Sequence, residues 1–476
     1  MARRMISTAS ASRSGLSLSE RRALLLLGDA LAVLAAMAVA LTIWVWTDNA
    51  WASPVATLMQ KGAPRLLWLI PLWFFLIANL YDPHVASSRG RTLYGLLLAA
   101  GILLVLYLAL YFYAPRGTLP RLVVLVFLVG VVAIELVWRM AYTRLLSLPS
   151  LQQPALVVGA GRAGSAILRV LVREVPGHFR VLGIIDDDPA KHGQAIEGVV
   201  VRGGTAQLRA LAAEEGVTAL ILAITGDLQS DLFEALLECQ ERGVEVIRMP
   251  TLYEELLGRV PIAYLNSEWI LTSFVDSARV HDLYSRAKRL GDILGALAGL
   301  IVVAALFPLL ALLVRLDSRG PVLYGQERSG RGGKPFRMVK FRTMVADAEP
   351  DGEARWAEPG DPRVTRIGRI MRRTRLDEIP QFWNILLGEM SLVGPRAERP
   401  TLVSRLESEV PFYRARMLAR PGATGWAQVN YRYGWSVEDA ATKLEYDLYY
   451  IRHRSLWLDL RILLRTLGTV VRFQGT

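Results

Sequence analysis

The sequence predicts a membrane protein with three folded parts: a four-helix transmembrane bundle, a doubly wound α/β domain, and an α+β domain with a re-entrant membrane helix. Three observations predict this fold class. Four apolar runs fill the first third of the chain, a strand–glycine turn–helix pattern follows, and a fifth apolar run, interrupted by a proline, precedes a basic C-terminal third. Apolar residues make up 53% of the 476 residues while 21% are charged, so soluble domains accompany the membrane segments.

The charge balance narrows the class of ligand. The formal net charge is +12, from 55 Lys and Arg against 43 Asp and Glu. In a chain with membrane segments this excess indicates anionic headgroups and phosphorylated substrates, and no nucleic-acid-binding motif accompanies it. The one cysteine, Cys239, excludes an internal disulfide and a site built from several thiolates.

The predicted bundle occupies residues 23–145, after a basic segment at 1–22 that lacks the pattern of a cleavable signal peptide. Its apolar runs are Ala23–Trp46, Leu66–Leu80, Leu93–Tyr113 and Leu122–Trp138. Three have the length that crosses a bilayer, and the second is short. Arginines are more frequent before the first run, after the second and after the fourth, so both ends of the bundle are predicted to be cytoplasmic. Asp29 and Glu135 lie near run ends, which favours helix packing over a transport pathway.

Residues 150–280 are predicted to form the α/β domain. Short apolar segments with the composition of buried strands alternate with amphipathic segments. The strands are expected at Ala155–Val158, Val181–Ile185, Val199–Arg202, Ala219–Ile224 and Val244–Met249, and helices after Gly161, at Ala206–Ala213 and at Leu228–Cys239. This order is Rossmann-like.

A glycine-rich turn follows the first of these strands. In Gly159-Ala-Gly161-Arg-Ala-Gly164 the glycines let backbone N–H groups approach a pyrophosphate at the start of a helix. Asp186 ends the next strand, where it would meet a ribose hydroxyl. Two interpretations stay open: a nucleotide-binding site, and a scaffold that keeps the fold for docking or regulation.

The fifth apolar run, Ile293–Val314, lies in a predicted membrane segment at 281–316. Pro308 interrupts it, and a proline inside a helix removes a hydrogen bond and bends the axis. Basic residues flank both ends, which indicates that both ends stay in the cytoplasm. The run therefore predicts a helix-break-helix hairpin that enters one leaflet and returns. The alternative is a fifth spanning helix, which would place the rest of the chain outside the cell.

A second motif, Tyr284-Ser-Arg-Ala-Lys288, has the spacing of the base in short-chain dehydrogenases and nucleotide-sugar dehydratases. Lys288 runs directly into the apolar hairpin, so no strands remain to complete such a sheet, and coincidence is the favoured interpretation. A membrane-anchored, NAD-dependent nucleotide-sugar dehydratase or epimerase is nevertheless the runner-up. It requires NAD(P) at the glycine turn, and it leaves residues 317–476 unexplained.

Residues 317–476 are predicted to form the α+β domain. The turn Ser329–Lys334 separates Val322–Arg328 from Phe336–Arg342, which predicts a β-hairpin. The tail Leu456–Phe473 is an apolar helix with arginines, suited either to the bilayer surface or to the domain core.

The strongest chemical signal lies in a basic helix predicted at Arg366–Arg373, whose arginines recur at helical spacing. It runs into two adjacent carboxylates, Asp377 and Glu378, and Pro380 is expected to end it. A solvated acidic pair is the ordinary interpretation of such a dipeptide. Concentrated arginines and an apolar, aromatic continuation argue for a site instead.

Transfer of a phosphoryl-linked sugar requires an oxygen nucleophile, a divalent cation and several fixed cations around the phosphate. Asp377 can supply the first and bind the second, while Lys340, Arg372 and Arg396 are candidates for the fixed cations. The five histidines are scattered, so no histidine cluster or Ser-His-Asp arrangement competes.

Four motifs in order resemble the bacterial sugar transferases, the monotopic phosphoglycosyl transferases. They are Lys340–Met344, Arg372–Asn384, Glu389–Arg396 and Arg420–Asn430. The resemblance covers residues 280–476, and the bundle with its α/β domain fits the large form of the family, the polyprenyl-phosphate hexose-1-phosphate transferases. Arg375 departs from the pattern, because many relatives have serine there.

The resemblance implies a ping-pong transfer of a sugar-1-phosphate from a UDP-sugar to undecaprenyl phosphate, or another polyprenyl phosphate. The residue matching Asp377, with Mg²⁺ bound, attacks the sugar-bearing phosphate, UMP leaves, and the carrier phosphate takes over the covalently bound phosphosugar. Glu378 orients or deprotonates the acceptor, Arg372 and Arg396 lie near the phosphate together with Lys340, and Pro308 matches the break of the family's re-entrant helix.

The same resemblance implies a place in the cell. It predicts a multi-pass protein of the bacterial inner membrane, with its folded domains on the cytoplasmic face, that initiates exopolysaccharide, capsule or O-antigen synthesis. The sugar stays open among glucose, galactose and N-acetylated sugars, and a homodimer is possible. A non-enzymatic membrane scaffold for an export complex is the third interpretation.

Overall fold

The structure is a computed structural model that describes residues 18–47, 59, 63–81, 86, 88–113, 121–146, 148–265, 282–345, 361–431, 434 and 436–471. The chain divides into two compact units, Met1–Leu257 and Gly258–Thr476. Most of the segment predicted at 1–22, and the domain boundary predicted between residues 280 and 281, lie outside the described residues. Each unit is described by itself.

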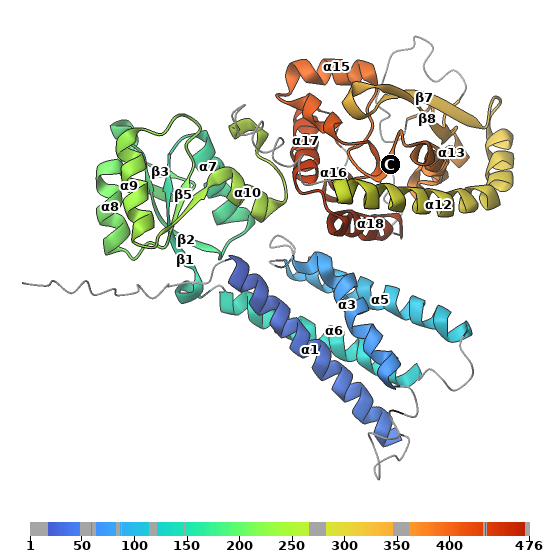
Figure 1. The fold of residues 1–476 in the computed structure, drawn as a ribbon, viewed down its shortest axis with the longest axis horizontal. Helices are drawn as coiled ribbons and strands as arrows, with labels where there is room; N and C mark the ends of the chain where they lie inside the picture. The colour runs from blue at the N-terminus through green and yellow to red at the C-terminus, as the bar shows by residue number, and fades with distance from the viewer. Residues whose placement is uncertain are drawn as a thin grey trace, which may run out of the picture. The chain divides into compact units, whose positions relative to one another are not determined.

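Apolar helices open the first unit (Figure 1). They are α1 (Leu18–Thr47), η1 (Ala63–Trp68) with α3 (Leu69–Ile77) and η2 (Ala78–Tyr81), α5 (Arg89–Tyr113) and α6 (Arg121–Leu146). Three of them, α1, α5 and α6, are long and apolar enough to cross a membrane, whereas Pro64–Ile77 is shorter. The expected short second run is therefore confirmed. In the core, α1 packs along α6, and Trp73 meets Phe127 edge to face.

The bundle encloses a cluster of polar side chains. Arg139 donates to Asp29 Oδ2 at 2.6 Å and to the Leu80 carbonyl at 3.0 Å, and Trp73 Nε1 donates to Glu135 Oε1 at 2.7 Å. All of these side chains are buried. Because polar groups in an apolar bundle need partners within the protein, the cluster joins α1, α3 and α6, as the helix-packing interpretation of Asp29 and Glu135 expects.

The rest of the first unit is an α/β sheet domain, as predicted. Its strands are β1 (Gln153–Val158), β2 (Phe179–Ile185), β3 (Ala195–Ile196), β4 (Val199–Gly203), β5 (Ala219–Leu222) and β6 (Glu245–Arg248). Its helices are η3 (Pro149–Leu151), α7 (Arg162–Arg169), η4 (Val170–Glu174), η5 (Pro189–Lys191), α8 (Thr205–Glu214), α9 (Ser230–Glu241) and α10 (Met249–Leu257). The strand order is β3-β4-β2-β1-β5-β6.

The apolar strand segments fold as expected because they are central in a parallel sheet. Strand β1 pairs in parallel with β2 and with β5, and every one of its residues is buried, as a strand covered on both faces requires. Several elements were not predicted, among them one strand and one helix. The short strand β3 pairs antiparallel at the sheet edge, and α10 follows the last strand without a break.

The second unit is the α+β domain with one long apolar helix. In order it contains η6 (Ile262–Tyr264), α12 (Asp282–Asp317), β7 (Leu323–Ser329), η7 (Arg331–Gly333), β8 (Pro335–Phe341), α13 (Arg366–Thr374), η8 (Leu376–Gln381), α14 (Phe382–Leu387), β9 (Ser391–Val393), α15 (Pro400–Glu409), η9 (Tyr413–Leu418), β10 (Gly422–Thr424), α16 (Trp426–Asn430), α17 (Val437–Arg452) and α18 (Leu456–Val471). The predicted hairpin is confirmed, because β7 and β8 pair antiparallel.

Helix α12 contains Pro308, the position at which the sequence predicts a break. It has 36 residues with Pro308 inside, is apolar enough to cross a membrane, and turns near its C-terminal end in Figure 1. The structure has a single helix where the sequence predicted helix-break-helix. A proline removes only one backbone hydrogen bond, and the helical hydrogen bonds resume beyond it. Much of its apolar surface is uncovered, with Ile301 72% exposed.

The start of α12 is fixed by buried carboxylates. The Tyr284 hydroxyl and the Lys288 ammonium donate to Asp459 Oδ2 at 2.9 and 2.8 Å. One turn further, Asp292 Oδ1 accepts from Ser391 Oγ and from the Leu392 backbone N–H, each at 2.9 Å. The tyrosine–lysine motif therefore joins α12 to α18 within the second unit. This agrees with coincidence as the interpretation of its dehydrogenase-like spacing.

Loss of the Tyr284 hydroxyl is expected to lower stability. Tyr284→Phe leaves the Asp459 carboxylate with one donor fewer in a buried place, which costs about 1–3 kcal/mol of unfolding free energy. Denaturation of the purified full chain in detergent measures the change. Tyr324→Phe, at an exposed position on β7, is the matched control, and equal stability of both variants would contradict the assignment.

Candidate active site

The acidic pair lies on a turn of its own. Helix α13 is capped at its start by Thr365, whose hydroxyl accepts from the Gly368 N–H, and at its end by Arg375, which adopts left-handed backbone angles of φ 57° and ψ 19°. The expectation that Pro380 ends the basic helix is wrong. Because a left-handed residue cannot continue an α-helix, the chain breaks at Arg375, and Asp377 and Glu378 lie on the separate 3₁₀ helix η8.

Glu378 is held by three cations. Its Oε1 lies 3.2 Å from Lys340 Nζ and 3.4 Å from an Arg396 guanidinium nitrogen, and its Oε2 lies 3.3 Å from Arg375. Burial opposes ionisation of this carboxyl, but Lys340, Arg396 and Arg375 outweigh it and hold its pKa well below the usual range. Glu378 is therefore a carboxylate whose charge is already matched.

The environment of the Asp377 carboxylate differs from that of Glu378. Its carboxylate is buried, with 8% of the residue exposed, and within the described ranges it forms no hydrogen bond or ion pair. Burial and the neighbouring Glu378 raise its pKa to about 6, while the charges of Lys340, Arg372 and Arg396 act in the opposite direction. Its oxygens are thus available to a ligand, in a place where cations surround them.

Four different elements bring these side chains together. Lys340 comes from β8, Arg372 from the last turn of α13, the acidic pair from η8, and Arg396 from the loop after β9. Arg372 Nε donates to Thr343 Oγ1 at 3.0 Å, which fixes the guanidinium next to the end of β8. The five residues that the sequence predicted are therefore one cluster.

Sequence reasoning missed two contributors. Arg375 was noted only as a departure from the family pattern, yet it is the third cation on Glu378. Asn384 was quoted within a motif and given no role. Its side chain accepts from the Val339 N–H and donates to the Arg337 carbonyl and to Glu389, so it joins β8 to α14. Its full burial is the property that a sequence pattern does not reveal.

A buried arginine, Arg416, holds the backbone of Arg396 in place. Arg416 donates to the Arg396 carbonyl at 3.2 Å and to Asp447 Oδ2 at 2.7 Å, and also to the Tyr413 hydroxyl. Since the Arg416–Asp447 pair is buried and each partner is matched, the backbone that carries Arg396 is held at a defined place.

The glycine turn of the first unit has a geometric explanation. Gly159 has a φ of +109°, and a Cβ on Gly164 would lie 1.9 Å from the Gly159 carbonyl oxygen. Both positions therefore require glycine for the turn itself. Gly161 caps α7 and faces open space, with no atom within 4 Å of an added Cβ.

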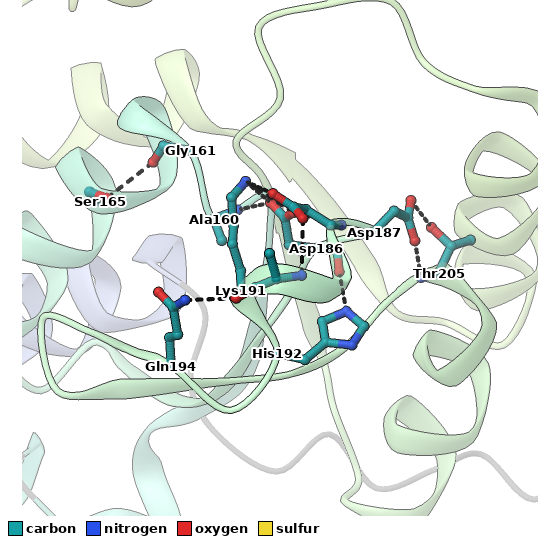
Figure 2. A network of polar contacts seen from close by, with 11 residues as sticks. Ala160, Gly161, Ser165, Asp186, Asp187, Lys191, His192, Gln194 and Thr205 are labelled. Carbon is teal, nitrogen blue, oxygen red and sulfur yellow. Dashed lines mark hydrogen bonds and ion pairs between the residues drawn. The ribbon is translucent and has the colours of Figure 1, made fainter.

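Asp186 closes this turn from the next strand (Figure 2). Its Oδ2 accepts from the Ala160 N–H at 2.6 Å, and its Oδ1 accepts from the Asp188 N–H at 3.0 Å and lies 3.2 Å from Lys191 Nζ. Burial opposes ionisation, but these donors lower the pKa of Asp186. The carboxylate that the sequence assigned to a ribose is thus engaged by the protein's own loop.

Apolar helices joined to a domain that holds a carboxylate among fixed cations define a class: a membrane-associated enzyme that acts on phosphate groups. The sequence matches the family model of the bacterial sugar transferases at residues 283–473. A model described as a CoA-binding domain matches residues 77–250, which include helices of the bundle as well as the α/β sheet.

Three relatives agree with the family match. A UDP-N-acetylgalactosamine-undecaprenyl-phosphate N-acetylgalactosaminephosphotransferase of Aeromonas hydrophila is 40% identical over 52% of this chain and 56% of its own. A UDP-galactose-lipid carrier transferase of Erwinia amylovora is 32% identical over 71% and 72%. An undecaprenyl-phosphate glucose phosphotransferase of Komagataeibacter xylinus is 32% identical over 71% and 63%. The chain thus spans between about half and three quarters of these relatives.

The chain belongs to the bacterial sugar transferase family. The resemblance found in the sequence is therefore confirmed, and the chain carries the helices, long and apolar enough to cross a membrane, that the sequence predicted. The names of the relatives state three different sugars, so family membership leaves the sugar open.

The pKa of Asp377 predicts how turnover depends on pH. With this pKa raised to about 6, the carboxylate is protonated as pH falls through 6, and kcat/KM should then fall about tenfold per pH unit. In Glu378→Gln a neighbouring negative charge is removed, so the inflection should move to lower pH. A pH–rate profile of both proteins tests this, and a wild-type profile that stays flat down to pH 5 would contradict it.

Proposed function

We propose that this protein transfers a sugar-1-phosphate from a UDP-sugar to undecaprenyl phosphate or another polyprenyl phosphate, and releases UMP. Such a transfer is the initiating step of exopolysaccharide, capsule or O-antigen synthesis. The single observation that carries the proposal is the buried Asp377 carboxylate, which has no protein partner in the described parts of the chain and is surrounded by cations. The names of the relatives, which state such donors and carriers, support the same substrates.

The chemistry follows from this carboxylate in two displacements. An oxygen of Asp377 attacks the phosphorus that bears the sugar, a carboxylate–phosphorus bond forms, and the bond to UMP breaks with its electron pair on the departing phosphate oxygen. An oxygen of the carrier phosphate then attacks the same phosphorus, and the Asp377 carboxylate leaves. The product is a sugar linked to the carrier through a diphosphate, and the aspartate is regenerated.

Lys340, Arg372 and Arg396 stabilise the charge that both displacements place on the phosphate oxygens. Their charges already act on Asp377, so a phosphate at Asp377 would meet donors that are in position before it arrives. Preorganised cations of this kind act on the transition state without reorganisation.

For Glu378 the contacts favour a positioning role. Of the two roles that the family resemblance offers, deprotonation of the acceptor requires a carboxylate with a pKa near the working pH. The pKa of Glu378 is held far below that by Lys340, Arg396 and Arg375. We therefore assign to Glu378 the task of holding Lys340 and Arg396, whose charges act on Asp377.

The chemistry of Asp377 fits Mg²⁺. No group of three or more His, Cys, Asp or Glu side chains able to hold a metal occurs among the residues described, but Mg²⁺ commonly binds one or two carboxylates together with substrate phosphates. Asp377 supplies such a carboxylate with unengaged oxygens. Bound there, Mg²⁺ would neutralise charge on the donor's phosphates.

The contacts of α12 support a re-entrant path. Near its N-terminal end, Tyr284 and Lys288 bind Asp459, and near its C-terminal end Leu310 and Val314 pack with Met371. A straight helix of 36 residues would be about 54 Å long, longer than the roughly 30 Å apolar layer of a bilayer. Both ends contact the same domain, so a bend at Pro308 that returns the chain to its side of entry accounts for them.

This path also gives the location that we propose. With both ends of α12 on one side, residues 317–476 lie on the cytoplasmic face of the bacterial inner membrane, where nucleotide-sugars are available. The arginine bias around the N-terminal helices supports the same side for the Rossmann-like domain. The homodimer stays a prediction.

For the α/β domain we propose that the glycine turn maintains the fold and takes no part in transfer. Gly159 and Gly164 are required by backbone geometry, and Asp186 is engaged by Ala160 and Lys191. Nucleotide binding at Gly159, Gly161, Gly164 and Asp186 is the alternative, in which a ribose hydroxyl replaces Lys191.

Asp377→Asn is expected to abolish release of UMP from UDP-sugars, because an amide oxygen is a poor nucleophile and ligates Mg²⁺ weakly. Membranes with the variant and with wild type are incubated with a panel of UDP-sugars and undecaprenyl phosphate, and UMP is measured. Mass spectrometry of the trapped wild-type enzyme should find the phosphosugar on Asp377. Wild-type turnover in the variant would remove this residue as nucleophile.

Arg396→Ala should lower kcat/KM by about 10²-fold, through the loss of one preorganised donor to the transition state. The matched control is Arg414→Ala, an exposed arginine of the same domain, which should change the rate by less than about twofold. Equal rates for both variants would exclude Arg396 from the site.

Gly161→Ala should leave UMP release within about twofold of wild type, because the added methyl group faces open space. Gly164→Ala should instead unfold the turn, because its Cβ would overlap the Gly159 carbonyl. Limited proteolysis compares their folding. Complete loss of UMP release in a folded Gly161→Ala protein would show that the turn serves transfer.

A further inference from the structure

The exposed face of helix α13 is strongly basic. Arg366, Arg369 and Arg373 are all exposed, and residues three or four positions apart are neighbours on one face of a helix. Their side chains form no hydrogen bond or ion pair with any residue that the structure describes. The positive charge of this row is therefore not compensated within the described parts of the chain.

The other face of α13 packs on the apolar helix α12. Met371 is buried in one cluster with Leu310 and Val314 of α12, and Ile367 is partly buried against that cluster. The first turn of α13 is joined to the end of α12, because the Ile367 N–H donates to Asp317 Oδ2 at 2.7 Å. The row of arginines thus lies beside the end of a helix that is apolar enough to cross a membrane.

The end of α12 extends this surface. Arg315 and Arg319 flank Asp317, are exposed, and likewise form no hydrogen bond or ion pair with a described residue. Apolar side chains are exposed next to the arginines, with Leu316 76% and Ile370 57% exposed. These two apolar residues and the five arginines of α12 and α13 form one basic surface. Basic and exposed apolar side chains together at the end of a membrane helix are typical of a surface that meets lipid headgroups.

The chemistry of the basic surface favours one kind of partner. Arginine binds phosphate oxygens in a bidentate manner. Clusters of about four to eight basic residues on the cytoplasmic side of a membrane helix attract anionic phospholipids, with a gain of about fivefold in affinity per residue. An acidic protein would also match the charge, but it would leave the exposed apolar side chains of α12 without a partner. A bilayer with anionic headgroups matches both.

We propose that the basic surface docks on anionic phospholipid headgroups, and that this docking sets the depth of the site at the membrane. The inference rests on the proposed location of α12 in the bilayer and on the proposed transfer reaction. Helix α13 leads through Arg372 to the turn η8 that carries Asp377. Headgroups bound by the basic surface therefore hold Asp377 near the layer that contains the carrier phosphate. Because the UDP-sugar is soluble and the carrier is not, docking assists the second displacement and leaves the first unchanged.

Docking can be measured without turnover. The full chain is placed in nanodiscs of phosphatidylcholine, alone or mixed with phosphatidylglycerol, and carries an environment-sensitive fluorophore on Ile370→Cys. Cys239 is buried, so the introduced thiol takes the label. We expect blue-shifted emission in the anionic discs only. The shift should disappear in the triple variant Arg366→Gln, Arg369→Gln and Arg373→Gln, and also at about 1 M salt, where the Debye length is about 3 Å. Equal emission in both kinds of disc would overturn the proposal.

Kinetics in the same discs, without the label, give the second measurement. In a ping-pong transfer, kcat/KM for the carrier reports the second displacement and kcat/KM for the UDP-sugar reports the first. Anionic lipid should raise wild-type kcat/KM for undecaprenyl phosphate about tenfold, and the triple variant of α13 should lose this increase. Its kcat/KM for the UDP-sugar should stay within about twofold of wild type. The matched control is Arg331→Gln, Lys334→Gln and Arg414→Gln, which removes the same charge from exposed positions at η7 and η9 and should behave as wild type.

The other outcomes separate the competing explanations. If the triple variant of α13 loses kcat/KM for the carrier equally in neutral and anionic discs, the arginines bind the carrier's own phosphate and the proposal is overturned. An equal loss in the control variant would show that net charge alone matters, and would also overturn it. If UMP is released without any response to anionic lipid, the transfer reaction stands and docking fails. If the fluorophore reports docking while no UDP-sugar yields UMP, the lipid surface stands and the transfer reaction fails.

Discussion

The ion-pair cluster on Glu378 is the interaction on which the site depends. Three cations from three different segments converge on one carboxylate, Lys340 from β8, Arg375 from the end of α13 and Arg396 from the loop after β9. Without Glu378 these charges would repel one another in a mostly buried place, and their positions would not be defined. Two of these cations, Lys340 and Arg396, also act on the neighbouring Asp377 carboxylate. In the proposed reaction, this difference gives the adjacent acids different roles: the protein already matches the charge of Glu378, and Asp377 is left for the substrate.

Much of this cluster was predictable from the sequence because its members lie in short contiguous motifs. Asp377, Glu378, Lys340, Arg372 and Arg396 were all identified from local composition and from the family resemblance. The strands of the α/β domain were equally predictable from the sequence, because a central strand covered on both faces, such as β1, is a continuous apolar segment. Local sequence patterns indicate local structure. They are therefore sufficient to identify site residues that belong to short contiguous motifs.

What was missed depends on contacts between distant residues or on backbone angles. The end of α13 at Arg375 could not be read from the sequence, because arginine is a good helix former and carries no signal for a left-handed conformation. Tyr284 and Lys288 meet Asp459 more than 170 positions away, so their spacing alone suggested a different enzyme. Asp186 has the position expected for a ribose contact, yet its oxygens bind Ala160 and Lys191. Strand β3 is only two residues long, too short for any periodicity.

Contacts at both ends of α12 connect this apolar helix to the elements that carry the site. At its start α12 is joined to α18 and β9 through Asp459 and Asp292. At its end the Asp317 carboxylate accepts from the Ile367 N–H at 2.7 Å, in the first turn of α13, the helix that leads to Arg372 and Arg375. Because the two ends of one apolar helix hold the two sides of the site, the depth of α12 in a bilayer would set the height of Asp377 above the headgroups. In the proposed reaction the carrier phosphate is confined to the headgroup layer, and a fixed carboxylate can reach it only at the correct height. The contacts that stabilise the domain would then also determine which phosphate Asp377 can meet.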